Sequence, residues 1–214
     1  MITFKQFLSE AELQELATIL KNDCKQFLSE NNHGYLRRGV ENLRGGKTVS
    51  IDGENVLLYS KRVRTDRSSL STSRTDQKIM DDWFLKKFNV KPRSGAAFML
   101  GMKAADETVK FYGVPCMVFP IGNYKAIWSP KIDDLFEHMD IQDKVLDSTG
   151  EDKHLSTADQ RKTRITKLLD EGDYQNSNIG EAIQGKMEIM VVCDAYYAIP
   201  MVYKVLLKEM MEKL

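Results

Sequence analysis

The sequence has few cysteines and histidines and no long apolar run. Its three cysteines, Cys24, Cys116 and Cys193, are far apart in apolar stretches, which predicts buried free thiols in a reducing compartment rather than a disulfide framework. The histidines are equally scattered and no C-x-x-C pair occurs, so no metal site is expected. No run of about 18 apolar residues is present, and the first residues lack the apolar segment of a signal peptide. These absences predict a cytoplasmic protein without a membrane partner.

The sequence also lacks an excess of either charge. Its 31 lysines and arginines balance 31 aspartates and glutamates, which excludes a surface that binds nucleic acid or anionic membrane over its whole area. Local patches remain possible. The 214 residues are 42% hydrophobic, enough for one core, and a domain has roughly 100–200 residues, so a single domain is expected.

Common nucleotide-binding and catalytic motifs are missing. Gly45-Gly46-Lys47-Thr48 is similar to the end of a P-loop, but Glu41 stands where the first glycine is required. No G-x-G-x-x-G segment opens a strand–helix unit, and no G-x-S-x-G turn presents a serine. The sequence therefore lacks the motifs that would indicate a P-loop enzyme, a dinucleotide-binding Rossmann enzyme or an α/β-hydrolase.

Short helices and strands are predicted along the chain, which gives an α+β fold. The spacing of apolar residues predicts helices over 10–30, 77–88, 103–112, 131–139 and 156–170, and a last helix from Pro200 to Leu214. The first of these has capping-box spacing between Ser9 and Glu12. Strands are predicted over 34–40, 95–101, 114–119, 124–128, 187–193 and 196–199, with a hairpin over 48–63 around Asp52-Gly53.

We expect one domain, 1–214, with an internal organisation set by these elements. An N-terminal helical cap over 1–32 precedes an α+β core formed by 33–130 and 180–203. The polar segment 131–179 is too long for an idle connection and is interpreted as an insertion or a lid, and 204–214 form a C-terminal helix.

Two charged residues interrupt apolar strands. Arg38 lies within a short strand just before Gly39, and Glu188 opens a strongly apolar strand near the end of the chain. A charge among apolar strand residues is costly to desolvate unless it has a partner. Each residue should therefore face a cleft or an opposite charge, either as a structural ion pair or as a functional site.

Several segments, taken in order, resemble the ADP-ribosyltransferase superfamily. Tyr35-Leu36-Arg37-Arg38-Gly39-Val40 is similar to the first-strand arginine–glycine motif of that family. The segment from Ser94 to Gly101 and the helix that follows, ending in Phe111-Tyr112, are similar to its central strand and helix. Met187-Glu188-Ile189-Met190-Val191 resembles the late strand that carries its catalytic glutamate. The resemblance implies a split, mainly antiparallel sheet and an NAD-dependent mono-ADP-ribosyltransferase, a glycosyltransferase acting on a protein or nucleic-acid acceptor.

The resemblance also implies roles for individual residues. Glu188 would stabilise the oxocarbenium-like ribose as nicotinamide leaves, and Arg38 would hold the diphosphate of NAD with the two parallel hydrogen bonds of its guanidinium. The other predicted cofactor-binding residues are Gly39, Ser94, Gly95, Phe98, Tyr112, Arg64 and Arg67. Arg37 is a further possible helper, and the small residues Ala96 and Ala97 would let nicotinamide approach the backbone.

The sequence departs from the family pattern in two places. Leu100-Gly101-Met102 stands where the family often has Ser-Thr-Ser, and Lys186 stands where arginine-modifying members have a second glutamate, which disfavours an arginine acceptor. A version of the site with His33 and Tyr112 remains an alternative.

Two other functions also remain open. One is a catalytically degenerate relative that binds a protein partner, and the other is a nucleic-acid-binding module that uses the basic region 36–74. The resemblance further suggests a phage or another mobile element as the source, in which case the protein would act in the host cytoplasm.

Overall fold

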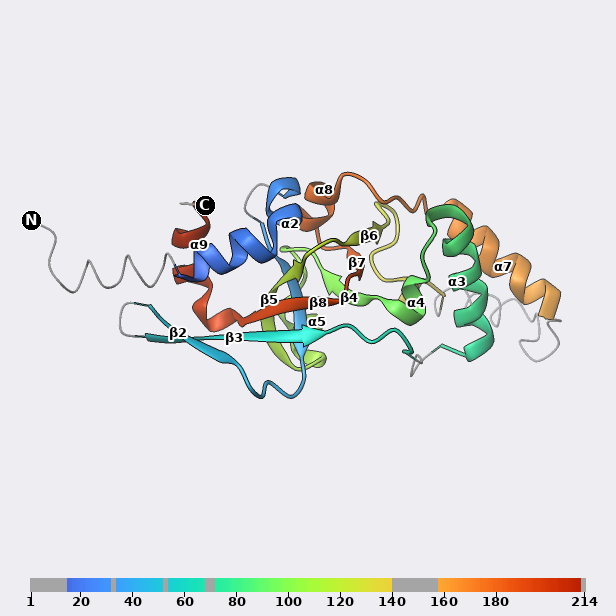
Figure 1. The fold of residues 1–214 in the computed structure, drawn as a ribbon. Helices are drawn as coiled ribbons and strands as arrows, with labels where there is room; N and C mark the ends of the chain where they lie inside the picture. The colour runs from blue at the N-terminus through green and yellow to red at the C-terminus, as the bar shows by residue number, and fades with distance from the viewer. Residues whose placement is uncertain (1–14, 32–33, 52–53, 68–71, 140–157, 213–214) are drawn as a thin grey trace, which may run out of the picture.

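A single antiparallel sheet forms the centre of the molecule (Figure 1). The computed structural model describes residues 15–31, 34–51, 54–67, 72–139 and 158–212. Within them, eight strands lie in the order β2-β3-β8-β5-β1-β4-β7-β6 and each neighbouring pair is antiparallel. The strands are β1 (Leu36–Val40), β2 (Lys47–Ile51), β3 (Glu54–Arg62), β4 (Ala97–Leu100), β5 (Val114–Ile121), β6 (Lys125–Trp128), β7 (Glu188–Val192) and β8 (Ala195–Pro200). The predicted α+β class is confirmed.

The helices start and stop at residues that the sequence marks. Ser73 caps α3 by accepting a hydrogen bond from the Asp76 amide at 3.1 Å, and Asn89 ends it in the left-handed conformation. Pro200 precedes a 3-10 turn that continues into the last helix. The helices are α2 (Lys25–Glu30), α3 (Arg74–Phe88), α4 (Pro92–Gly95), α5 (Asp106–Phe111), α7 (Ala158–Glu171), α8 (Ile179–Gln184) and α9 (Lys204–Glu212), with further helical residues at 15–23 and 135–139.

Two predicted elements differ from the structure in a way that has a clear cause, and one helix was not predicted. The N-terminal helix is interrupted at Cys24, and its proposed capping box, Ser9 and Glu12, lies outside the described residues. The predicted strand 95–101 starts only at Ala97, because Pro92 opens the one-turn helix α4 that includes Gly95. Helix α8 was not predicted, because its six residues are too few to show a helical period.

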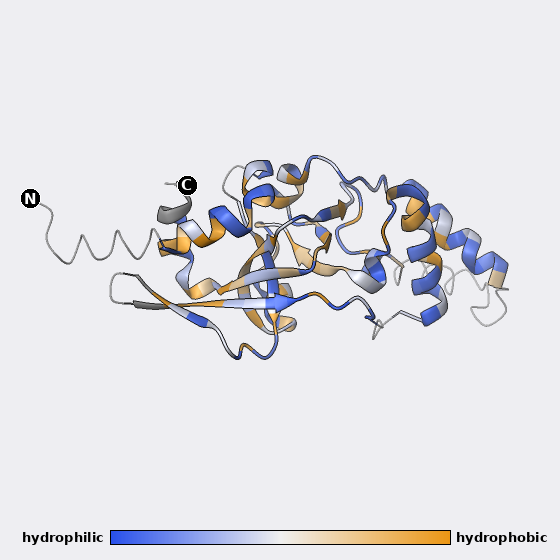
Figure 2. Cartoon of the chain, in the orientation of Figure 1, coloured by the Kyte–Doolittle hydropathy of each residue, from blue (hydrophilic) through white to orange (hydrophobic). Residues whose placement is uncertain are grey.

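The sheet is covered on both faces by two apolar clusters. The larger cluster packs the N-terminal helices and α8 against the sheet, with Phe27 edge-on to Phe119 at a centroid distance of 6.1 Å. The second packs α3 and α7 against the end of the sheet formed by β6 and β7, and Figure 2 shows the polar outer faces of these two helices. Successive residues of β7 alternate between the clusters, since Ile189 belongs to the first and Met190 to the second. Strand β7 is therefore held from both sides.

Both described ends of the segment 131–179 belong to the core. Ile132 and Leu135 at one end, and Leu168 and Leu169 in α7 at the other, are buried in the second cluster. An ion pair between the buried Asp76 in α3 and the partly exposed Arg161 in α7 adds to this packing. The lid interpretation can therefore apply only to 140–157, which lie outside the described residues.

The sheet is nearly divided between β1 and β4. These strands share one registered pair, Arg37 with Leu100, whereas β1 and β5 share five. The guanidinium group of Arg38 lies beyond that pair and donates to the main-chain oxygen of Phe98. The strands on the two sides of this junction, which we call the two halves of the sheet, are therefore joined by the least main-chain pairing between neighbouring strands.

The three cysteines are buried and free, as predicted. Burial raises the pKa of each thiol to about 12, so none is a reactive thiolate at neutral pH. In the described part of the chain, no helix is both long and apolar enough to span a bilayer.

Gly39 allows the end of α5 to pack directly on β1. A Cβ atom at this position would overlap the carbonyl oxygen of Val109 and lie 2.6 Å from the carbonyl carbon of Tyr112. Gly39→Ala should therefore lower the free energy of unfolding by about 1–3 kcal/mol. Urea denaturation measures this, with Gly95→Ala as the control, because a Cβ there meets nothing within 4 Å. Equal stability of the two variants would contradict the packing described here.

Candidate active site

The two charged residues that interrupt apolar strands lie on either side of β4. Arg38 is on β1 and Glu188 is the first residue of β7, and both strands pair with β4. Arg38 donates to the Phe98 carbonyl and hydrogen-bonds the hydroxyl of Tyr196, with its guanidinium carbon 5.9 Å from the centre of that ring. These contacts fix the orientation of Arg38 and leave other N–H groups of the guanidinium for a ligand.

Two more arginines converge on the ring of Phe98. The guanidinium carbon of Arg67 lies 4.5 Å from the ring centre, and that of Arg93 lies 4.6 Å from it. Arg67 comes from the loop after β3 and Arg93 from α4. Burial, followed by the positive charges of Arg38 and Arg93, lowers the pKa of Arg67. Arg38 and Arg93 are therefore both close enough to repel the charge of Arg67.

Glu188 is largely withdrawn from water beside these cations. Its side chain is 15% exposed, and its Oε1 lies 3.5 Å from Nη1 of Arg93. Its main-chain N–H donates to the Asp133 carbonyl at 2.8 Å. Burial raises the pKa of Glu188 to about 7, against the opposing attraction of Arg93, and Asp134 raises it further. A carboxyl group that changes charge near neutral pH is typical of functional sites.

Tyr112 lies at the rim of the same site. Its side chain is 54% exposed and its ring is edge-on to Phe111 at 5.2 Å. Partial burial, followed by the negative charges of Asp134 and Glu188, raises the pKa of Tyr112, whereas Arg67 lowers it. The phenol is therefore close enough to Glu188 and Arg67 to be affected by their charges. Tyr112 lies at the edge of the group formed by the residues described before it. We call that group, which consists of Arg38, Arg67, Arg93, Phe98 and Glu188, the arginine–glutamate cluster.

Other predicted site residues have different positions. Gly39 packs under α5, as described above. Ser94 contributes its carbonyl, which accepts from the Arg67 amide at 3.0 Å, while its hydroxyl faces the Lys91 carbonyl at 3.4 Å. Space is open beside Gly95. Arg64 is exposed and pairs with Asp66 at 3.3 Å, so it lies outside the cluster.

Three residues that were expected to assist NAD binding instead stabilise the fold. Arg37 is buried and binds the Ala104 carbonyl and Asp106, so it anchors the start of α5 rather than assisting Arg38. Ala96 and Ala97 are buried in the two apolar clusters. His33, which the alternative site required, lies outside the described residues.

The sequence did not reveal Arg93 or Asp134 as site residues. Arg93 stands between Pro92 and Ser94 on a single helical turn, where no periodicity shows that its side chain points inward. Asp134 caps the turn at 135–139 by accepting from the amides of Phe136 and Glu137. Its effect on Glu188 depends on packing between distant segments, for which the sequence offers no local signal.

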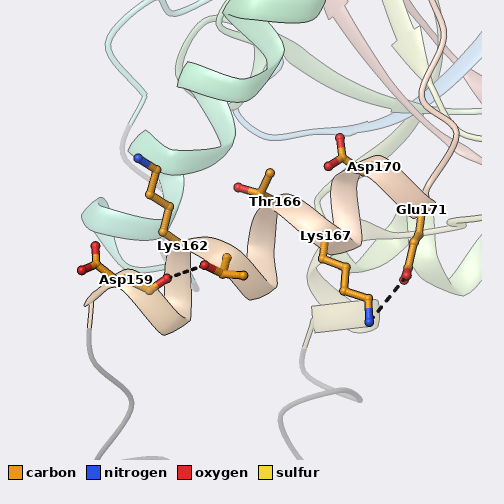
Figure 3. Close-up of a pocket in the computed structure, with 7 residues that line it drawn as sticks. Asp159, Lys162, Thr166, Lys167, Asp170 and Glu171 are labelled. Atoms are coloured by element: carbon orange, nitrogen blue, oxygen red, sulfur yellow. Dashed lines mark hydrogen bonds and ion pairs between the residues drawn. The ribbon is translucent and has the colours of Figure 1, made fainter.

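A separate hollow lies along the outer face of α7 (Figure 3). It is lined by side chains of that one helix, including Lys167 and Glu171, which form an exposed ion pair at 3.8 Å. None of its lining residues belongs to the arginine–glutamate cluster. Exposed charges along one helix provide no enclosed binding site.

Within the described ranges, no three or more His, Cys, Asp and Glu side chains are grouped to hold a metal ion. Comparison with protein-family models, with curated proteins and with solved structures found no match. The function therefore has to be inferred from the site itself.

Proposed function

We propose that the protein is an NAD-dependent mono-ADP-ribosyltransferase that modifies a protein or nucleic-acid acceptor. The observation that supports it most is the link between Arg38 and Glu188 through Phe98: Arg38 donates to the Phe98 carbonyl, and Glu188 pairs with Arg93, whose guanidinium lies on the Phe98 ring. The resemblance of the sequence motifs is an independent support. In this proposal NAD is a substrate rather than a resident cofactor.

The chemistry requires a carboxylate next to a site for a diphosphate. Cleavage of the bond between nicotinamide and ribose C1′ leaves the bonding electrons on nicotinamide and a positive charge on the ribose. Glu188 would orient the ribose hydroxyls and stabilise that charge, because a carboxylate is effective where water is excluded. The acceptor then forms a bond to C1′ and loses a proton.

Arg38, Phe98 and Tyr112 would bind the rest of NAD. The free N–H groups of Arg38 suit a phosphate oxygen, since a guanidinium donates two parallel hydrogen bonds. The exposed ring of Tyr112 can stack on nicotinamide, and the open space at Gly95 leaves room close to the backbone.

The test is release of nicotinamide from NAD, with transfer of labelled ADP-ribose in a cell extract. A labelled macromolecule together with nicotinamide supports the transferase. Failure of the wild-type protein to bind NAD would remove the proposal.

A second candidate is a degenerate member that binds a nucleotide or a protein without turnover. Two observations favour it. The β4 residue in register with Glu188 is Leu100, at the end of the strand where the family often has hydroxyl side chains. In addition, Glu188 already pairs with Arg93 rather than being free to act on a substrate. This candidate predicts NAD binding without nicotinamide release, or a protein partner retained by Arg38→Ala.

The nucleic-acid-binding alternative has less geometric support. Within the basic region 36–74, Arg37 is buried against Asp106, and Lys47 pairs with Glu15 at 2.5 Å. An affinity for nucleic acid that falls steeply with salt would support that alternative.

The rate of NAD hydrolysis, with water as acceptor, should rise as pH is raised from about 6 to about 8. The ionised form of Glu188 is needed, and its pKa is about 7. Two arginines face Glu188: Arg93 from α4 and Arg67 from the loop after β3. Asp134 and the Leu135 amide face it from the start of the turn at 135–139. The tyrosines Tyr112 and Tyr174 complete the set. Both tyrosines have raised pKa values and stay neutral over this range.

Stability should change in the opposite direction over an overlapping range. Because the folded protein holds the Glu188 proton more tightly than the unfolded chain, this residue's contribution to stability is lost as pH rises from about 4.5 through about 7. A rate that increases with pH therefore cannot come from the contribution of Glu188 to stability. A flat or falling rate, with stability monitored in the same buffers, would contradict the role of Glu188.

A further inference from the structure

Arg67 and Arg93 are held in place through their main chains. The side-chain amide of Gln77 donates to the Arg67 carbonyl at 2.7 Å and to the Arg93 carbonyl at 3.3 Å. The Arg93 amide donates to Oδ1 of Asp81 at 2.7 Å. Gln77 and Asp81 are buried side chains of α3. The two guanidinium groups therefore project over Phe98 from a rigid support, so a ligand would meet donors that are already positioned.

Of the three arginines around Phe98, Arg93 has a carboxylate partner among the described residues, whereas Arg38 and Arg67 have none. Arg38, Arg67 and Arg93 act on the same site, and Glu188 is the acidic group paired with one of them. Two further carboxylates are near, and each keeps its negative charge while it accepts hydrogen bonds from main-chain amides: Asp81 from the Arg93 amide, and Asp134 from the amides of Phe136 and Glu137. In the described part of the chain neither forms an ion pair with Arg38 or Arg67, so these two guanidinium groups are available to an anionic ligand.

The hydrogen-bonding capacity of these arginines is also partly unused. The side chain of Arg93 is 8% exposed, and its buried Nη1, which lies 3.5 Å from Oε1 of Glu188, makes no hydrogen bond to any residue that the structure describes. Among the same residues, the guanidinium group of Arg67 lies over the Phe98 ring and forms no side-chain hydrogen bond or ion pair. Two adjacent arginines thus present free N–H donors over an aromatic ring.

We propose that Arg67 and Arg93 form a second phosphate site, which, together with Arg38, binds the diphosphate of a dinucleotide. A diphosphate has two phosphate groups, and Arg38 supplies one guanidinium fork, so a second set of donors is required. Binding draws Arg93 toward the phosphate and weakens its pairing with Glu188. The assignment to a dinucleotide rests on the proposed function, whereas the anion site itself does not.

Calorimetric titration with inorganic pyrophosphate and with ADP-ribose tests this site. The wild-type protein should bind both, and Arg67→Gln and Arg93→Gln should each weaken binding by about 10-fold or more. Arg44→Gln is the matched control, because it removes the same charge from an exposed side chain between β1 and β2. Thermal unfolding of each variant shows whether it is folded, and Arg67→Gln serves as the second variant if Arg93→Gln does not fold.

The outcomes separate this proposal from the enzymatic one. If the wild-type protein binds pyrophosphate but releases no nicotinamide, the transferase proposal fails and the phosphate site stands. If nicotinamide is released and folded Arg67→Gln and Arg93→Gln keep the wild-type KM for NAD, the phosphate site is wrong and the transferase stands. The phosphate site is also wrong if the wild-type protein binds neither pyrophosphate nor ADP-ribose.

Discussion

Replacement of Glu188 by glutamine should slow nicotinamide release from NAD by at least about 100-fold. Glutamine keeps the size of the side chain but removes the negative charge that would stabilise the ribose cation. Binding of NAD should change little, because the arginines proposed to hold its phosphates are retained. The measurement is the rate of nicotinamide release at saturating NAD, with affinity determined separately.

The control for this variant is Glu181→Gln. Glu181 is an exposed carboxylate on α8, so the same chemical change there should leave both rate and affinity unaltered. A folded Glu188→Gln protein that keeps more than about a tenth of the wild-type rate would remove the proposed role of this residue.

Replacement of Arg38 by glutamine should weaken NAD binding by about 10- to 100-fold, which corresponds to about 1.5–3 kcal/mol for hydrogen bonds to a charged group. Lysine keeps the charge but not the planar fork, so Arg38→Lys should lie between the wild type and Arg38→Gln. Calorimetric titration with NAD measures both variants.

Arg62→Gln provides the comparison for Arg38. Arg62 is a strand-borne arginine on β3 with an exposed side chain, and its loss changes the net charge equally. Because Arg38 also donates to the Phe98 carbonyl, thermal unfolding must show that the variant is folded. Wild-type affinity in folded Arg38→Gln would exclude this arginine from the NAD site.

The elements that the sequence predicted well are those with a strong local pattern. The hairpin of β2 and β3 has two β-rich runs around a turn dipeptide, and the register of the strands places Lys47 opposite Leu58 as a short connection requires. The apolar run of β7 predicts a strand buried on both faces. Local periodicity could not predict α4 or α8, which are too short to show it.

The candidate site was predictable where a charge conflicts with its local surroundings. Arg38 and Glu188 each stand among apolar strand residues, and this conflict marked them before any distance was known. Arg93 has no such conflict in its own segment. Its part in the site follows from the packing of α4 between α3 and β7, a long-range arrangement that spacing along the chain does not encode.

The single registered pair between β1 and β4 has a consequence for a bound ligand. A molecule held by Arg38 on one side and by Glu188 on the other crosses the seam where the sheet has least main-chain pairing. Its binding would join the two halves as an additional cross-link, so that ligand affinity would add directly to the free energy of unfolding.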